Sequence, residues 1–348
     1  MGRTMVVSWG LGAMGGGIAR LLASRDSAVV VGAIDSDPAK IGRSLGEVIG
    51  EPSAYPGVIV SGDPVSVLEG EGRDAQVVVV ATGSFLRDVS GQILLAVRHG
   101  KNVISIAEEM AYPMAADPDI ARRIDELAKE HGVSVLGTGI NPGFILDTLI
   151  ITLTSVCAEV TRVRAARIND LSPFGPTVMR TQGVATTEDE FWQGIASGAI
   201  VGHIGFPESM HMIADALGWK LDEIRETREP IISRTERVTK YARVLPGMVA
   251  GCRHIARAFS GGREVITLEH PQAVLPSAEG VETGDFIWIE GVPGVNLAMK
   301  PEIPGGTGTI AISANMIPRV MAAPPGLLTM RDLPTPSAHL SPGGGLRC

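Results

Sequence analysis

The chain has 348 residues, more than a single hydrophobic core usually spans, so we expect two domains. Its formal net charge of −8 at pH 7 provides no positive surface for nucleic acid or an anionic membrane, and no apolar run reaches the ~18 residues of a membrane span, so we expect neither partner. The three cysteines form no CxxC pair, which predicts neither a disulfide framework nor a zinc cluster and fits a cytoplasmic location.

Residues 4–140 alternate short β-branched runs with longer segments of helical spacing, a pattern typical of a parallel sheet with crossover helices. The helical segments 86–99 and 118–131 are each followed by a glycine, Gly100 or Gly132, as expected where a helix ends in a left-handed turn. The pattern predicts an α/β fold with a doubly wound parallel sheet. The expected strands are residues 4–9, 28–34, 58–60, 76–81, 102–106 and 134–137.

A GxGxxG motif lies between the first expected strand and the first expected helix, which is the context of a dinucleotide-binding Rossmann domain. Its first glycine, Gly10, permits a tight turn, Gly12 lets the backbone approach a pyrophosphate, and Gly15 allows close packing of helix on strand. The N-terminus of the helix attracts the anion. We predict that the residues in contact with the pyrophosphate are Gly10, Leu11, Gly12, Ala13, Met14 and Gly15.

Asp35 ends the second expected strand, about twenty residues after the motif, where an acidic side chain accepts hydrogen bonds from the adenosine ribose hydroxyls. Its charge opposes a 2′-phosphate, which predicts NAD(H) as the cofactor. The neighbouring Ser36, together with Lys40 and Arg43, would soften that rejection, so NADP(H) is expected as a second cofactor. The alternative is that the glycines only make a turn and Asp35 only caps the next segment, which requires motif, context and acid spacing to coincide by accident.

Polar residues follow three further expected strands. Thr82 and Gly83 come after the fourth, in the crevice where open α/β sheets bind ligands, so a contact with the nicotinamide ribose and a plain turn are both open. Glu108 and Glu109 come after the fifth, where they are either reactive carboxylates beside the nicotinamide or solvated loop acids. Asn141 follows the sixth and offers two donors and an acceptor, which predicts a cofactor contact.

Beyond residue 140 strand-like stretches at 159–168, 263–268 and 285–289 are separated by helical segments and Gly/Pro turns, which predicts a second, α+β domain with a mainly antiparallel sheet. Segment 306–321 again has helical spacing and is expected to return to the first domain. The expected domains are 1–140 for the dinucleotide, 141–305 for substrate and dimerisation, 306–334 for the returning segment and 335–348 for a tail that includes a disordered 341–345.

Four side chains are candidates for a substrate pocket: Phe144, Phe174, His203 and Phe206. Phe144 ends the glycine-rich segment 137–144, the expected hinge between the domains and a wall of the site. For the phenylalanines, core packing is the default alternative. His203 with Glu208 and His211 could suggest a metal site, but a helix start with ordinary polar residues explains them, and we expect no metal.

Longer motifs carry a family resemblance. They lie at residues 10–15, 33–38, 108–113, 137–144, 169–176, 201–208 and 300–306. Through them the chain resembles, over residues 4–334, the 2,4-diaminopentanoate dehydrogenase family, which includes related NAD(P)-dependent amine dehydrogenases and is distantly related to dihydrodipicolinate reductase.

The resemblance implies reversible oxidation of a small primary amine to a ketone and ammonia, and hence reductive amination in the other direction. It also implies a homodimer built through the second domain, and Glu108 as the catalytic carboxylate. It does not separate 2,4-diaminopentanoate from a simple alkylamine as substrate. Two alternatives stay open: a dihydrodipicolinate reductase-like enzyme or amino-acid dehydrogenase, and a non-catalytic NAD(P)-binding sensor in which Glu108 is a surface acid.

Overall fold

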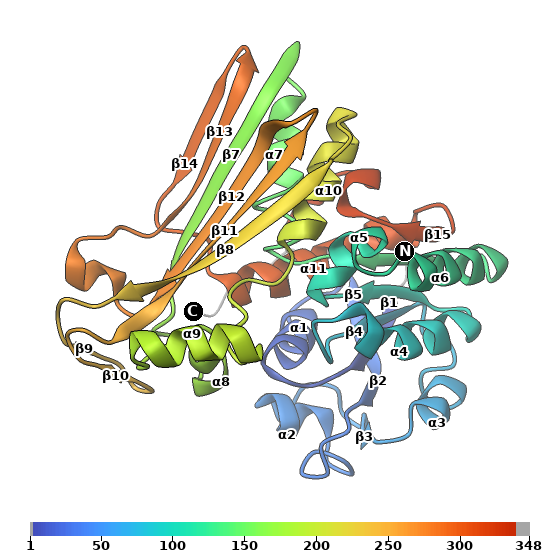
Figure 1. The fold of residues 1–348 in the computed structure, drawn as a ribbon. Helices are drawn as coiled ribbons and strands as arrows, with labels where there is room; N and C mark the ends of the chain where they lie inside the picture. Colours follow the sequence, from blue (N-terminus) through green and yellow to red (C-terminus); the bar gives the residue numbers. More distant parts are fainter. Residues whose placement is uncertain (1–2, 339–348) are drawn as a thin grey trace. The chain divides into compact units, whose positions relative to one another are not determined.

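The computed structural model describes residues 3–338, which form two compact units (Figure 1). The first unit contains residues 3–144 and 305–338, and the second contains residues 145–304. The first unit thus runs a few residues past the expected boundary at 140, because Ile140 donates its N–H to Thr309 and Phe144 packs against the core of that unit. The segment 341–345, expected to be disordered, lies outside the described residues.

The first unit is built on a seven-stranded sheet in the order β15-β6-β5-β4-β1-β2-β3, with every neighbouring pair parallel. This arrangement confirms the Rossmann-type α/β prediction. The strands are β1 (Thr4–Trp9), β2 (Ala28–Ile34), β3 (Val60–Ser61), β4 (Val77–Val80), β5 (Asn102–Ser105), β6 (Ser134–Gly137) and β15 (Gly326–Leu328).

Two strands differ from expectation by more than one residue at an end. β3 begins only at Val60, because Ile59 forms an isolated antiparallel bridge with Ser44 and does not continue the parallel pairing with β2. β15 was not expected from the sequence. Its three residues extend the sheet only because β6 offers them a parallel partner.

Helices α4 (Leu86–Arg98) and α6 (Pro118–Glu130) agree with the expected segments, and Gly100 and Gly132 follow them at φ +68° and +67°. Helix α11 (Gly305–Met321) matches the expected returning segment. The other helices of this unit are α1 (Ala13–Ala23), α2 (Leu45–Ile49), α3 (Pro64–Glu69) and α5 (Pro113–Ala116), with 3-10 turns η1 (Glu108–Ala111) and η3 (Met330–Asp332).

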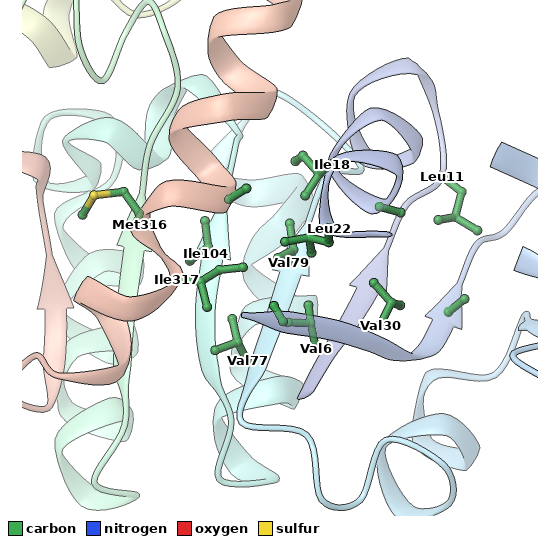
Figure 2. Packing of buried hydrophobic residues seen from close by; sticks show 14 of the residues in the cluster. Val6, Leu11, Ile18, Leu22, Val30, Val77, Val79, Ile104, Met316 and Ile317 are labelled. Carbon is green, nitrogen blue, oxygen red and sulfur yellow. The ribbon is translucent and has the colours of Figure 1, made fainter. Parts of the chain in front are cut away.

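Apolar side chains cover both faces of this sheet. On one face, Ile18 and Leu22 of α1 and Ile317 of α11 pack against strand residues such as Val6 and Val79 (Figure 2). On the other face, α4 and α6 pack against alternate positions of the same strands. Because α11 shares the core of α1, the last described part of the chain is integral to the first unit.

The second unit contains a six-stranded sheet in the order β14-β13-β7-β12-β11-β8. Only β12 and β7 are parallel neighbours, so the sheet is mainly antiparallel, as predicted. The strands are β7 (Glu159–Asp170), β8 (Glu223–Ile232), β11 (Val249–Ser260), β12 (Arg263–Ala273), β13 (Gly284–Val292) and β14 (Val295–Met299), with a separate hairpin of β9 (Arg237–Val238) and β10 (Arg243–Val244).

Strand β12 continues five residues beyond the expected end at Leu268, to Ala273. The sequence pattern ends early because His270 and Gln272 interrupt the apolar alternation, although both side chains are buried. The helices of this unit are α7 (Thr148–Thr154), α8 (Pro176–Thr181), α9 (Glu188–Ser197) and α10 (Phe206–Leu217), with the 3-10 turn η2 (Pro276–Glu279). No helix within residues 3–338 is both long and apolar enough to cross a membrane.

Replacing Ile317 with Ala should lower the free energy of unfolding by about 2–5 kcal/mol, because it leaves a cavity between α11 and the sheet. Equilibrium unfolding in urea measures this change. Thr307→Ala at the exposed start of α11 is the control and should change stability by less than about 0.5 kcal/mol. A loss below about 1 kcal/mol for Ile317→Ala would contradict the packing of α11 in this core.

Candidate functional site

The glycine loop between β1 and α1 has the local geometry that a dinucleotide requires. Gly10 has φ +92°, and a Cβ there would lie 2.5 Å from the Ala81 carbonyl oxygen. A Cβ on Gly15 would lie 1.8 Å from the Gly10 carbonyl oxygen, so the helix packs closely on the turn only with glycine. A Cβ on Gly12, by contrast, would have no neighbour within 4 Å. The backbone at Gly12 is therefore open to a ligand.

Helix α1 begins at this opening. Gly12 is its N-cap and makes no side-chain capping bond, so the first turn presents backbone N–H groups and the positive end of the helix dipole. Ala13 is exposed and Met14 is half-buried, whereas Leu11 is buried beneath the loop. A pyrophosphate is the kind of anion that such a helix end binds, so the residues present fit the predicted dinucleotide.

Asp35 lies at the end of β2 and ties the glycine loop to that strand. Its Oδ2 accepts the Leu11 N–H at 2.7 Å and the Lys40 ammonium at 2.9 Å, and its Oδ1 accepts the Asp37 N–H at 2.8 Å. Burial raises the pKa of Asp35, but these donors outweigh burial and hold the pKa below its usual value. Asp35 is thus a charged acceptor with Lys40 beside it, while Ser36 is exposed.

Thr82 and Gly83 follow β4. The Thr82 hydroxyl bonds to Gln92 Oε1 at 2.5 Å, and its methyl group would contact any Cβ placed on Gly10. A Cβ on Gly83 would make only ordinary contacts, the nearest at 3.6 Å, so packing does not require glycine there. Thr82 therefore borders the glycine loop, and the cofactor contacts of both residues stay predictions.

Glu108 and Glu109 lie in η1, directly after β5, and the structure gives them different roles. The Glu109 carboxylate accepts the Leu86 N–H at 2.6 Å and so binds the first turn of α4. Burial raises the pKa of Glu108, and the charge of Glu109 raises it further, whereas bonds from its own N–H and from Ser84 lower it in part. Glu108 is therefore a half-buried carboxyl group that is more basic than an ordinary glutamate.

Asn141 lies in the loop after β6, at the same carboxyl edge of the sheet, and precedes a cis peptide bond to Pro142. A Cβ on Gly143 in this loop would lie 2.4 Å from the Gly139 nitrogen, so the turn is closely folded. Phe144 follows and packs against the core shared by α1 and α11. The first unit thus places Asn141 among the strand ends that carry the other predicted cofactor residues.

The second unit brings His203 and Phe206 together in a buried polar cluster. The His203 ring centroid lies 4.6 Å from that of Phe206 and 4.8 Å from that of His270, and the Phe206 centroid lies 4.8 Å from that of His254. His270 Nε2 bonds to Asn169 Oδ1 at 2.9 Å. Burial lowers the pKa of all three histidines, so the cluster contains neutral imidazoles.

Sequence reasoning missed two histidines of this cluster, His254 and His270. They are direct cross-strand partners on β11 and β12, a relation that depends on strand register. Phe174 packs in a separate apolar cluster with Leu171 and Met179, so its assignment to the substrate pocket stays a prediction.

Arg167 of β7 forms buried interactions within the second unit. Its Nη1 lies 2.5 Å from Asp285 Oδ1, and both side chains are buried. Its other terminal nitrogen donates to the Ile303 carbonyl oxygen. This charge is therefore neutralised by an ion pair.

A family model described as the 2,4-diaminopentanoate dehydrogenase C-terminal domain matches residues 144–343. The chain is 45% identical over 339 residues to the 2,4-diaminopentanoate dehydrogenase of Acetoanaerobium sticklandii, covering 97% of this chain and 95% of that protein. It is 26% identical to an amine dehydrogenase of Streptomyces virginiae, covering 94% of this chain and 95% of that protein.

Among solved structures, an amine dehydrogenase from Mycobacterium smegmatis matches with a TM-score of 0.84 and 28% identity, covering 97% of each chain. GenD2 from gentamicin A biosynthesis, solved in complex with NAD, matches with a TM-score of 0.57 and 15% identity, covering 95% of this chain and 90% of that one. The second likeness shows a shared fold alone.

Replacing Asp35 with Ser should shift dinucleotide preference toward NADPH by at least about tenfold, because it removes a charge that opposes the 2′-phosphate. The ratio of the Kd values of NADH and NADPH, followed by fluorescence, measures the shift. Asp37→Ser is the control, since Asp37 is an exposed carboxylate that also lies near Lys40, and it should leave the ratio within about twofold. An unchanged ratio in Asp35→Ser would remove Asp35 from the ribose site.

Proposed function

The chain belongs to the 2,4-diaminopentanoate dehydrogenase family, and we infer from this membership that it catalyses the NAD(P)-dependent, reversible oxidative deamination of a small primary amine. It is an oxidoreductase that acts on CH–NH2 groups. The observation that carries the inference is the 45% identity to a named 2,4-diaminopentanoate dehydrogenase over 97% of the chain. The membership favours this activity over an imine reductase or a non-catalytic sensor.

For the substrate we propose 2,4-diaminopentanoate, and a simple alkylamine is the second candidate. The identity to the diaminopentanoate enzyme, 45%, exceeds the 26% identity to the amine dehydrogenase, and both alignments cover more than nine-tenths of the chain. In the reverse direction the same activity is reductive amination of a ketone with ammonia. Phe144, Phe174, His203 and Phe206 are proposed to contact the substrate.

NAD(H), with NADP(H) as a second choice, supplies hydride transfer when bound. In this proposal, Gly10, Leu11, Gly12, Ala13, Met14 and Gly15 hold its pyrophosphate. Asp35 and Ser36 hold the adenosine ribose, and Thr82, Gly83 and Asn141 hold the nicotinamide end. The open backbone at Gly12 supports the first assignment, and the charged Asp35 carboxylate supports the second.

We assign the proton chemistry to Glu108. A primary ammonium group must lose a proton before its α-carbon can give up hydride, so a base is needed near the nitrogen. The raised pKa of Glu108 makes it a stronger proton acceptor than an exposed glutamate. Once that proton has passed to solvent, the regenerated carboxylate stabilises the positive charge on the substrate's iminium nitrogen and accepts a proton from the water that attacks the carbon.

Glu109 is unsuited to this role because its carboxylate already binds the first turn of α4 through the Leu86 N–H. Loss of this acceptor would disturb the start of a helix, whereas the bond from Ser84 to Glu108 comes from a loop and holds no helix end. The local structure thus supports the first acid of the pair as the proton acceptor.

We also propose a cytoplasmic homodimer whose interface lies mainly on the second unit. Trp288 and Phe286 stack at 5.9 Å on one face of β13, Trp288 is 36% exposed, and Arg164 lies over its ring. The alternate residues Ile287 and Ile289 are buried on the other face. An exposed tryptophan stacked on a half-buried phenylalanine, with an arginine over its ring, is typical of the centre of a protein interface.

The substrate proposal is tested by following NAD+ and NADP+ reduction with 2,4-diaminopentanoate and with a series of simple alkylamines. We expect a higher kcat/KM with the diamine. Equal or better turnover of an alkylamine would replace the proposed substrate. If the enzyme instead oxidises NADH with a cyclic imine and without ammonia, it is an imine reductase and the proposed activity is wrong.

Replacing Glu108 with Gln should lower kcat for amine oxidation by roughly 10²-fold or more, because the amide keeps the shape but loses the basicity. NADH binding, followed by fluorescence, should stay within about twofold, since Glu108 is not among the proposed pyrophosphate or ribose contacts. Glu109→Gln is the matched control and should lose much less activity, because its amide oxygen still accepts the Leu86 N–H.

The pH profile supplies a second measurement on the same variant. Because burial raises the pKa of Glu108, the ionised base is lost as pH falls through that raised value. The parent enzyme should therefore show an acidic limb in kcat/KM above the usual pKa of a glutamate, and Glu108→Gln should lack it. If Glu108→Gln keeps a kcat near that of the parent, or if Glu109→Gln is the variant that loses activity, the assignment of the base to Glu108 is wrong.

Light scattering on the purified protein should give the mass of a dimer at micromolar concentration. Trp288→Glu places a charge in the proposed interface and should shift the mass toward that of a monomer. Trp192→Glu, at the other exposed tryptophan of this unit, is the control and should remain dimeric. A monomeric parent protein would end the dimer proposal.

A further inference from the structure

The loop between α9 and α10 carries His203, and side chains from β8, from β11 and from the residue after α8 hold its backbone. The bonds are Arg228 Nε to the Val201 carbonyl oxygen at 2.8 Å, Gln182 Nε2 to the Gly202 carbonyl oxygen at 2.8 Å, and the His203 N–H to His254 Nδ1 at 3.0 Å. Three consecutive residues are therefore each fixed by a side chain distant in sequence. A loop held in this way has little freedom to reposition its side chains.

Two of these bonds belong to a closed ring. His254 Nε2 bonds to Glu226 Oε2 at 2.9 Å, and the same oxygen accepts Arg228 Nη2 at 2.7 Å. Arg228 in turn donates to the Val201 carbonyl oxygen, two residues before His203. The ring thus starts at the His203 N–H, passes through His254, Glu226 and Arg228, and returns to the same loop.

The ring fixes the tautomer of His254. Because Nδ1 accepts the His203 N–H, that nitrogen carries no proton, and the single proton of the neutral imidazole lies on Nε2, where it is donated to Glu226. His254 is fully buried. The opposite tautomer would point an N–H of His254 at the N–H of His203 and would leave Glu226 without this donor.

Gly202 is required for the same arrangement. Its φ is +69°, and a Cβ there would lie 2.9 Å from His254 Nδ1. The loop backbone consequently approaches the imidazole as closely as a glycine permits. The close approach places the His203 N–H within bonding distance of His254.

The imidazole of His203 is not a member of this hydrogen-bonded ring, which uses only the backbone N–H of that residue. The imidazole is half-buried and packs edge-on against Phe206 at 4.6 Å and His270 at 4.8 Å. The His203 N–H donates to His254 Nδ1, and the ring of His254 packs against Phe206 at 4.8 Å between centroids. A small movement of the loop would therefore move the ring of His203 relative to both of its neighbours.

We propose that His254 and Glu226 are positioning residues for amine recognition, which set the place of the His203 imidazole without touching the amine themselves. The proposal rests on the proposed function, in which His203 contacts the substrate. Misplacement of a contacting group by about 1 Å can cost as much as 10²-fold in rate, so this ring should govern the affinity for the amine. It should not govern the affinity for the dinucleotide, whose proposed contacts belong to the other unit.

The central experiment compares His254→Phe with His254→Asn. Phenylalanine keeps a ring against Phe206 but removes both hydrogen bonds, and it should raise the KM for the amine by roughly tenfold, with the Kd of NADH unchanged within about twofold. Asparagine presents an Oδ1 close to the position of Nδ1, so it should again accept the His203 N–H. His254→Asn should therefore recover most of the parent KM, which a purely space-filling role would not explain.

Glu226→Leu breaks the same ring from its more exposed side, which keeps the proposal testable if His254→Phe does not fold. It should raise the amine KM in the same direction. The matched control is Glu223→Leu on the same strand, whose carboxylate pairs with Arg225 at the surface. This control should leave the KM unchanged.

Hydrogen exchange of the His203 amide, in the parent and in each variant, tests the ring without reference to turnover. Exchange should be slow in the parent, faster by at least about tenfold in His254→Phe and slow again in His254→Asn. A parent protein without amine turnover overturns the proposed function but leaves this measurement decisive. Unchanged exchange in His254→Phe, or a KM in that variant equal to the parent value while His203→Ala raises it, overturns the positioning role.

Discussion

The hydrogen bond from the Leu11 N–H to the Asp35 carboxylate is the constraint on which the first unit's site depends. It joins the glycine loop after β1 to the end of β2, so the turn, the start of α1 and the acidic side chain keep one geometry. The bond is effective because Asp35 is buried yet remains charged, with Lys40 and the Asp37 N–H as further donors. A carboxylate fixed in this way orients the loop, and in the proposed function it presents a negative charge to the ribose.

Two carboxyl groups at the same edge of the sheet have opposite pKa shifts, and their surroundings explain both. Asp35 is buried, but three donors compensate it, so its pKa is lowered. Glu108 is half-buried with weaker compensation and a second acid beside it, so its pKa is raised. One group is thereby suited to bind hydroxyls as an anion, and the other to exchange a proton. Burial raises the pKa of both groups, so the two pKa values differ because hydrogen-bond donors compensate Asp35 more fully than Glu108.

In the second unit, one face of the sheet buries imidazole, amide and carboxylate groups. Each buried polar group needs a hydrogen-bond or ion-pair partner. Here the polar groups pair with one another, as Arg167 does with Asp285 and His254 with Glu226. These pairs make the polar face rigid. Side chains of the same face also hold the backbone of the loop that carries His203.

The sequence by itself determined what depends on neighbouring residues: the alternation of strands and helices in residues 4–140, the glycine turn before α1, Asp35 at a strand end and the helix ends at Gly100 and Gly132. Periodicity and turn chemistry are local, so they can be identified without a fold. Only the tertiary structure decided that β12 continues through His270, that β15 joins the sheet, that Glu109 caps α4 and that His254 lies opposite His270. Each of these features depends on a partner far away in the chain, such as Asn169 for His270. Strand register and burial bring such partners together only in the folded chain, so the local sequence does not reveal them.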